Sequence, residues 1–196
     1  MRSPQCEIFI LAGGLSTRMG YDKSRVRLGR HSLLQHIRAA ASQLPFPVRV
    51  IRRDAVPRCG PIGGIYTALK RSRADSILLL ACDMPFISPS FLKKMIKAFH
   101  LAPPARQLNT PAVECPPLPI ALFARENKLA GFPCLLRREP SLPIVFAQIA
   151  TAQFSLQALA KKLRAKTLSP PRAAAIQLTN INTPADLQKA SRRANI

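Results

Sequence analysis

Acidic residues are scarce in this chain of 196 residues, which has nine Asp and Glu against 30 Lys and Arg. The formal net charge is therefore 30 − 9 = +21. A charge of this size indicates attraction to polyanions. The bases are dispersed, however, and no basic run is interleaved with aromatic residues as in a stacking platform for single strands. Specific nucleic-acid binding is therefore not expected.

Paired cysteines and long apolar runs are also absent. The chain has five cysteines, an odd number, and no C-x-x-C pair, so neither a disulfide framework nor a zinc knuckle is indicated. No stretch approaches the roughly 20 apolar residues that a bilayer-spanning helix needs. The apolar run near the N-terminus is interrupted by Glu7 and leads straight into glycines, which argues against a signal peptide. These absences predict a cytoplasmic protein that does not enter a membrane.

Glycine is uncommon as well, with eight residues against 19 prolines. The prolines concentrate in residues 45–61, 103–119 and 133–143. Because proline cannot donate a hydrogen bond to a ladder or to a helix interior, we expect these three stretches to be loops.

The glycines that are present mark the most informative stretch, residues 11–23, which follows an apolar run. Its sequence is Leu-Ala-Gly-Gly-Leu-Ser-Thr-Arg-Met-Gly-Tyr-Asp-Lys. Small residues after a strand let backbone N–H groups approach an anion, and Arg18 and Lys23 add positive charge to the same place. The motif is neither G-x-G-x-x-G nor G-x-x-x-x-G-K-[ST], so the dinucleotide and P-loop interpretations do not apply. The pattern predicts a triphosphate site.

Apolar runs and amphipathic segments alternate along the chain. The expected strands are residues 6–11, 48–51, 77–82, 119–123 and 174–178. The expected helices are residues 33–44, 65–71, 91–99, 155–164 and a terminal helix that begins after Thr183. This alternation predicts an α/β fold, a Rossmann-like three-layer α/β/α arrangement with a mostly parallel central sheet. The length suits a single domain over residues 1–196.

Three loops follow strand ends in this scheme, at residues 13–23, 60–64 and 83–85. In an open parallel sheet the carboxyl ends of the strands share one edge, where ligands bind. Asp83 follows six apolar residues and suits Mg²⁺, which prefers one or two carboxylates together with phosphate oxygens and water. Asp54, before the second loop, is equally consistent with a turn residue and with a nucleotide contact. The three histidines lack a spacing that would join them in a metal site.

Four ordered motifs together resemble one family. They are Leu-Ala-Gly-Gly-x-Ser-x-Arg-Met-Gly-x-Asp-Lys at 11–23, Gly-Pro-Ile-Gly-Gly-Ile at 60–65, Cys-Asp-Met-Pro-Phe-Ile at 82–87 and Asn-Ile-Asn-Thr-Pro-Ala-Asp-Leu at 180–187. The chain resembles the molybdenum cofactor guanylyltransferases, the MobA-like branch of the nucleotidyltransferases. The resemblance implies transfer of GMP from GTP to molybdopterin with Mg²⁺, giving the guanine dinucleotide cofactor and pyrophosphate. It also implies molybdoenzymes or cofactor-insertion proteins as partners.

The resemblance assigns roles to individual residues. It implies a GTP-binding half over about residues 1–100 and an acceptor half over about residues 101–196. The implied catalytic residues are Arg18, Lys23 and Asp83, with Asp83 as the metal ligand. The implied nucleotide-binding residues are Leu11, Ala12, Gly13, Gly14, Lys23, Asp54, Gly60, Pro61 and Asp83, and the implied acceptor-binding residues are Asn180 and Asn182.

The chain also departs from the family pattern. The family has a strand and a helix before the Asp54 region, whereas here residues 48–51 run almost directly into Arg52, Arg53 and Asp54. Two alternatives therefore stand beside the guanylyltransferase. One is a related nucleotidyltransferase that uses CTP or another acceptor. The other is a catalytically degenerate maturation or nucleic-acid-associated partner, which the charge of +21 motivates.

Overall fold

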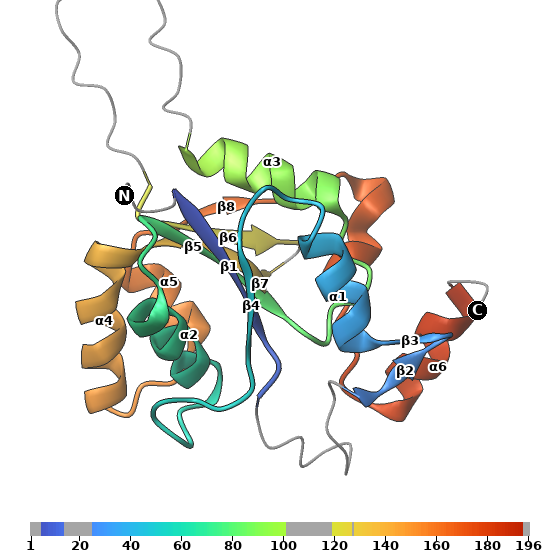
Figure 1. The fold of residues 1–196 in the computed structure, drawn as a ribbon, viewed down its shortest axis with the longest axis horizontal. Helices are drawn as coiled ribbons and strands as arrows, with labels where there is room; N and C mark the ends of the chain where they lie inside the picture. The colour runs from blue at the N-terminus through green and yellow to red at the C-terminus, as the bar shows by residue number, and fades with distance from the viewer. Residues whose placement is uncertain (1–4, 14–24, 101–118, 127, 194–196) are drawn as a thin grey trace, which may run out of the picture.

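The chain forms one six-stranded sheet covered by helices on both faces (Figure 1). The computed structural model describes residues 5–13, 25–100, 119–126 and 128–193. The strand order is β4-β1-β5-β7-β6-β8, and β7 runs antiparallel to the other five strands. The strands are β1 (Cys6–Leu11), β4 (Val48–Ile51), β5 (Ser76–Ala81), β6 (Ala121–Arg125), β7 (Leu129–Arg137) and β8 (Lys166–Leu168).

The helices form two layers (Figure 1). On one face lie α1 (Leu33–Ala41) and α3 (Pro89–His100), and on the other lie α2 (Gly60–Arg71), α4 (Arg138–Ala150) and α5 (Leu156–Lys162). The mostly parallel three-layer α/β/α fold expected from the sequence is therefore confirmed. Among the helices that the structure describes, none is both long enough and apolar enough to cross a bilayer.

The core lies around β1 and β5, which pair in parallel over six residues each. Their side chains are buried on both faces of the sheet, as expected for strands between two helix layers. A separate small cluster of apolar residues packs the short hairpin β2 (Arg27–Leu28) and β3 (His31–Ser32) against α6 (Pro184–Arg193). The members of this cluster are Val26, Leu28, Leu33, Phe86, Ile181, Leu187 and Ala190.

Most elements of the first half begin and end close to the expected residues. Ser32 caps α1 in a reciprocal capping box with Gln35, and the Ser88 hydroxyl accepts a hydrogen bond from Phe91 N in α3. Helix α2 begins at Gly60 instead of Ile65, so the glycine motif forms its first turn.

Two expectations for the second half are wrong, and one strand was not expected. The stretch 133–143 is not a loop, because Pro133 lies inside β7 after a cis peptide bond and Pro143 lies inside α4. Residues 174–178 are not a strand but part of a 3₁₀ helix, η2 (Arg172–Leu178). The edge strand is instead β8, which the sequence pattern did not indicate.

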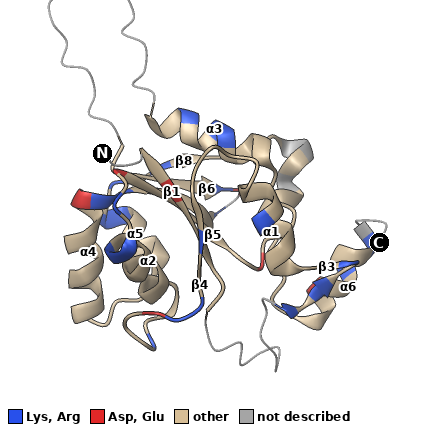
Figure 2. Ribbon diagram, viewed as in Figure 1, with Lys and Arg blue, Asp and Glu red and all other residues tan. Residues whose placement is uncertain are grey.

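Basic residues are spread over several helices and loops, while acidic residues are few (Figure 2). One acid is deeply buried: Glu7, in β1, is 3% exposed. Its carboxylate accepts a hydrogen bond of 2.6 Å from the Ser72 hydroxyl and lies 3.3 Å from the Arg49 guanidinium.

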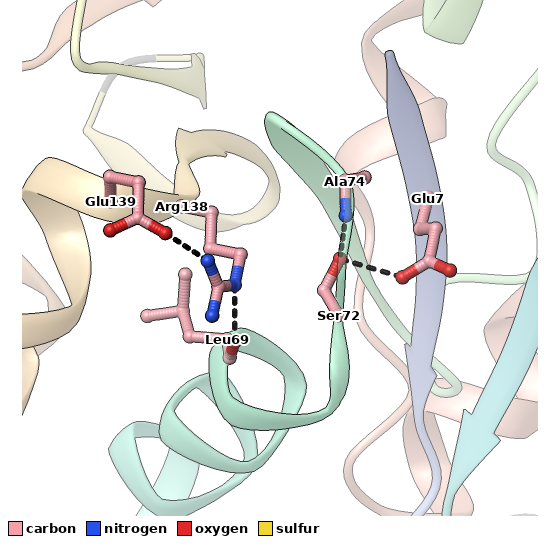
Figure 3. A network of polar contacts seen from close by, with 6 residues as sticks. All are labelled: Glu7, Leu69, Ser72, Ala74, Arg138 and Glu139. Atoms are coloured by element: carbon pink, nitrogen blue, oxygen red, sulfur yellow. Dashed lines mark hydrogen bonds and ion pairs between the residues drawn. The ribbon is translucent and has the colours of Figure 1, made fainter. Parts of the chain in front are cut away.

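The hydrogen bond between Ser72 and Glu7 fastens the amino-terminal edge of the sheet to the end of α2 (Figure 3). Nearby, Arg138 donates from Nε to the carbonyl of Leu69 and pairs with Glu139. This polar network lies where β1 and β5 begin, at the edge of the sheet opposite their carboxyl ends.

Candidate active site

The carboxyl ends of β4, β1 and β5 lie side by side in register. Leu11, the last residue of β1, pairs with Ile51 at the end of β4 and with Ala81 at the end of β5. The segments that follow these three strands therefore leave the sheet at one edge, as expected from the sequence.

The segment after β1 is held between its two neighbours. Ala12 N donates to the carbonyl of Ile51 at 2.8 Å, and Cys82 N donates to the carbonyl of Leu11 at 3.2 Å. At Gly13 a Cβ atom would lie 2.6 Å from the carbonyl oxygen of Arg52, which is closer than real Cβ contacts allow. The glycine therefore lets the first part of the phosphate motif lie directly on the backbone that follows β4.

The first turn of α2 lies beside the same edge of the sheet, after the segment that follows β4. Gly60 is the first residue of this helix, at φ +53°, and Pro61 is the second, a position that suits proline because no intrahelical donor is needed there. Within the same turn, Gly63 and Gly64 leave room for the Asp54 carboxylate, whose oxygens would lie 3.1 Å and 3.5 Å from Cβ atoms at these two positions.

The chain after Asp54 is tied to this helix. Ala55 N donates to the Thr67 hydroxyl at 2.8 Å, and that hydroxyl donates to the carbonyl of Gly63 at 2.7 Å. Burial raises the pKa of the Asp54 carboxyl above its ordinary value. Asp54 is thus a half-buried carboxyl beside the first turn of α2.

The segment after β5 meets the C-terminal motif. Ile181 N donates to the carbonyl oxygen of Asp83 at 2.8 Å, so residues 180–182 lie against the loop that carries Asp83. The side-chain oxygen of Asn180 is buried and has no hydrogen-bond partner among the residues that the structure describes. A buried amide oxygen without a partner is costly unless a ligand completes it.

Asp186 fixes the remaining part of that motif. Its Oδ2 accepts hydrogen bonds from Asn182 N at 3.0 Å and from Thr183 N at 2.9 Å, and Asp186 N donates to the Thr183 hydroxyl at 3.1 Å. These bonds lower the pKa of the Asp186 carboxyl, first through the Thr183 side chain and then through the Asn182 backbone. We did not expect this role, although a Thr followed three residues later by an acid is the pattern of a capping box.

The donor set at this edge fits Mg²⁺ bound together with a triphosphate. Asp83 offers a carboxylate, and no group of three or more His, Cys, Asp or Glu residues suited to a metal occurs in the described part of the chain. Mg²⁺ is commonly held by one or two carboxylates with phosphate oxygens and water, and does not require an all-protein cage.

The structure therefore brings together nine of the predicted site residues. They are Leu11, Ala12, Gly13, Asp54, Gly60, Pro61, Asp83, Asn180 and Asn182. Gly14, Arg18 and Lys23 lie outside the described residues, so their roles stay predictions.

Two of the histidines have structural contacts. His36 Nε2 lies 2.9 Å from the carbonyl of Leu28, and His100 Nε2 lies 2.9 Å from the Ser76 hydroxyl. Cys6 and Cys82 are buried in the core, as expected for cysteines in strand-like runs, and burial raises the pKa of the Cys6 thiol to about 11.

Comparison with known families agrees with this geometry. Residues 8–141 match the model of the MobA-like NTP transferase domain. The chain belongs to this family. A relative from Flavobacterium johnsoniae, named as a probable molybdenum cofactor guanylyltransferase, is 28% identical over 91% of this chain and 93% of its own length.

Solved structures share the fold of this MobA-like transferase. Molybdopterin-guanine dinucleotide biosynthesis protein A from Archaeoglobus fulgidus superimposes with a TM-score of 0.72 at 19% identity, covering 96% of this chain and 98% of that one. The 4-diphosphocytidyl-2C-methyl-D-erythritol synthase of Anaerococcus prevotii has a TM-score of 0.66 at 12% identity, with coverage of 98% and 97%. The fold is thus common to enzymes named for guanine and for cytosine nucleotides.

Proposed function

We propose that this MobA-like transferase moves GMP from GTP to molybdopterin, giving the guanine dinucleotide cofactor and pyrophosphate. The observation that carries the proposal is the contact between Ile181 N and the carbonyl of Asp83, which joins the C-terminal Asn motif to the carboxylate loop. A transferase needs its acceptor beside the reacting phosphate, and this contact supports such an arrangement. The name of the Flavobacterium johnsoniae relative agrees with the same activity.

The reaction requires positioning more than new covalent chemistry at the protein. A phosphate oxygen of molybdopterin attacks the α-phosphorus of GTP, the bond to the β-phosphate breaks, and pyrophosphate leaves. Because a phosphate is already a competent nucleophile, the protein must hold two anions in line and neutralise their charge. Bound Mg²⁺ would supply charge neutralisation at the phosphate oxygens.

Each part of the edge has an assigned task in this proposal. Leu11, Ala12 and Gly13 hold the nucleotide through their backbone, and Arg18 and Lys23 neutralise the triphosphate. Asp83 holds the metal, and Asp54 with the first turn of α2 holds the nucleotide side of the site. Asn180 and Asn182 hold the pterin, and the buried side-chain oxygen of Asn180 is available to accept a hydrogen bond from it.

The direct experiment incubates the protein with molybdopterin, GTP and Mg²⁺ and measures the dinucleotide and pyrophosphate. The expected result is formation of both in equal amounts. A parallel series with ATP, CTP and UTP distinguishes a guanylyltransferase from a related cytidylyltransferase, which the shared fold allows. Failure to form product from an intact acceptor with any nucleotide would contradict the proposal.

Asp83→Asn is the matched variant for the metal assignment. Removing the charge of the only proposed metal carboxylate should lower kcat by about 100-fold or more, since one electrostatic contact to a developing charge is commonly worth that much. Asp75→Asn, at the opposite end of β5, changes the charge equally and should leave kcat unchanged. A normal kcat for Asp83→Asn would refute the assignment, and residual RNA binding without any turnover would favour the degenerate alternative.

We assign the cytoplasm as the site of action, where the thiols stay reduced. The four cysteines that the structure describes are free thiols, buried at positions 6, 59, 82 and 134. We also assign residues 1–196 to one catalytic unit, with the nucleotide held mainly by the first half and the acceptor by the second.

A further inference from the structure

The order of the strands indicates where the base of a bound nucleotide lies. Asp83 follows β5. The segment 180–182, which the proposed function assigns to the acceptor, is held against it by a hydrogen bond from Ile181 N to the carbonyl oxygen of Asp83. β1 lies between β5 and β4 in the sheet. The proposed function assigns the end of β5 to the acceptor and the metal, and the motif after β1 to the phosphates, so the end of β4 is the part of this edge that is left for the rest of the nucleotide. Its base then lies over the residues that follow β4.

Two arginines occupy that position. β4 ends at Ile51, and Arg52 and Arg53 are the only residues between it and Asp54. The carbonyl oxygen of Arg52 faces Gly13, where an added Cβ would lie only 2.6 Å away. The backbone of Arg52 therefore lies against the start of the phosphate motif.

Both guanidinium groups are available for a ligand. Arg52 and Arg53 are exposed, and within the described part of the chain neither side chain has a hydrogen bond or an ion pair. Arg49, in β4, provides a contrast, because its guanidinium lies 3.3 Å from the buried Glu7 carboxylate. The Arg49 side chain is thus paired with an acid near the start of β1. Arg52 and Arg53 have no such pairing with any residue that the structure describes.

The donor pattern of arginine matches one base in particular. A guanidinium presents forked N–H donors, and guanine presents two acceptors, O6 and N7, at the spacing of that fork. Adenine has an amino donor in place of O6, and cytosine presents an amino donor at N4. Arginine at this position therefore favours the O6/N7 edge of guanine over the corresponding edges of adenine and cytosine.

We propose that one guanidinium of the Arg52–Arg53 pair binds the O6 and N7 atoms of guanine and makes this transferase selective for GTP. The proposal deepens the proposed function and rests on it, because the direction of the nucleotide follows from the acceptor lying beside Asp83. Asp54, with Gly60 and Pro61 at the start of α2, then holds the nucleotide from the other side and does not set the choice of base.

The test compares GTP, ATP and 7-deaza-GTP, in which a C–H group replaces the N7 acceptor. We would measure kcat/KM with molybdopterin as acceptor for the wild type, Arg52→Gln, Arg53→Gln and the double variant. Equilibrium binding of the three nucleotides without any acceptor would be measured in parallel. Arg73→Gln is the control, since this exposed arginine precedes β5 at the opposite edge and loses the same charge.

The wild type should use 7-deaza-GTP about tenfold less well than GTP, as expected for loss of one acceptor of a forked pair. In the double variant this penalty should disappear, and the preference for GTP over ATP should fall by about 10- to 100-fold. Glutamine itself pairs well with adenine, so it moves the preference in the same direction. The single variants identify which arginine makes the contact.

Two results would overturn the inference. The first is an equal loss of GTP and ATP use in the double variant with the preference intact, which would mean that the arginines serve the phosphates. The second is an unchanged 7-deaza-GTP penalty in the double variant. If the wild type binds GTP selectively but transfers nothing to molybdopterin, the proposed function fails while the binding data still decide the role of the arginines.

Discussion

Gly13 illustrates how the absence of a single methyl group shapes the edge of the sheet at the carboxyl ends of β4, β1 and β5. A Cβ at this position would lie 2.6 Å from the carbonyl oxygen of Arg52 and 2.9 Å from its carbonyl carbon, and backbone atoms of a strand end cannot move aside easily. At Gly64 the nearest atoms, at 3.0 Å and 3.3 Å, are the methyl groups of Leu11, which can rotate away. The two glycines should therefore respond differently to the same substitution.

We expect Gly13→Ala to push the phosphate motif away from β4 and to raise KM for GTP by about tenfold. The strain corresponds to about 1–3 kcal/mol, typical of added atoms in a packed site. Gly64→Ala is the matched control and should change KM by less than about threefold. Steady-state kinetics with GTP as the varied substrate measure both, and equal KM values for the two variants would contradict the steric argument.

His100 should make stability depend on pH. Burial of its imidazole lowers its pKa below the ordinary 6.5, and the nearby Arg137 acts in the same direction, while the carbonyl of Ile96 and Asp75 oppose the shift. The folded protein thus binds a proton at His100 less readily than the unfolded chain does. The contribution of this group to stability is complete above pH 6.5 and is lost as the pH falls below that value.

The measurement is the guanidinium chloride midpoint of the wild type and of His100→Gln at pH 8 and at pH 5.5. The wild type should lose more stability between the two pH values than the variant does, because the variant lacks the titrating ring. Other titrating groups are common to both proteins and cancel in the comparison. An identical pH dependence in the two proteins would show that His100 is not the responsible group.

At the scale of elements, the sequence predicted the first half of the fold better than the second. From β1 to α3 the helices have one apolar stripe each and β1, β4 and β5 are short, mainly apolar runs, so hydrophobic periodicity finds them. The short strands β2 and β3 have no such run and were not predicted. β7 was missed because Pro133 interrupts a strand that is otherwise buried. α4 was missed for two reasons. Its own apolar residues are distributed around the helix and do not form a single stripe, and Pro143 lies inside it.

Residues 174–178 form a short run of small and apolar residues, which periodicity alone cannot assign to a strand or to a helix. The candidate site was also predictable only in part. The nucleotide edge was predictable because glycine and aspartate follow strands that lie next to one another. The support of Asn182 by Asp186 was not predicted, because it depends on backbone hydrogen bonds that only the folded turn reveals.

The start of α6 therefore offers a test at this scale. Asp186→Ala removes the acceptor for Asn182 N and Thr183 N, which should cost about 0.5–2 kcal/mol as other lost helix caps do. Because these bonds hold the acceptor segment, KM for molybdopterin should rise about tenfold while KM for GTP stays within about twofold.

Gln188→Ala, an exposed change on the same helix, is the control for general effects on α6. Thermal unfolding of both variants separates loss of stability from loss of acceptor binding. A parallel rise of both KM values in Asp186→Ala would contradict a specific role in the acceptor segment.

At the scale of the whole molecule, the dominant feature is the charge of +21. Basic residues are spread over both helix layers (Figure 2). The few acids include Glu7, which is buried against Ser72 and Arg49. Repulsion among the remaining cations opposes the compact state. This general field also attracts anionic substrates to the sheet edge, so part of the apparent affinity for GTP should weaken with salt.

Stability should therefore rise with ionic strength, in contrast to a protein held together by surface ion pairs. We expect Tm to increase by several degrees between about 20 and 200 mM NaCl and then to level off, because the Debye length has fallen to about 7–8 Å by then. A scan of Tm against NaCl concentration, repeated with Na₂SO₄ at equal ionic strength, measures this. A rise that continues linearly above 200 mM and is much steeper for sulfate would indicate exclusion of salt from the protein surface instead of screening. A fall in Tm over the low range would mean that attractive pairs outweigh repulsion, contrary to the excess of 30 bases over nine acids.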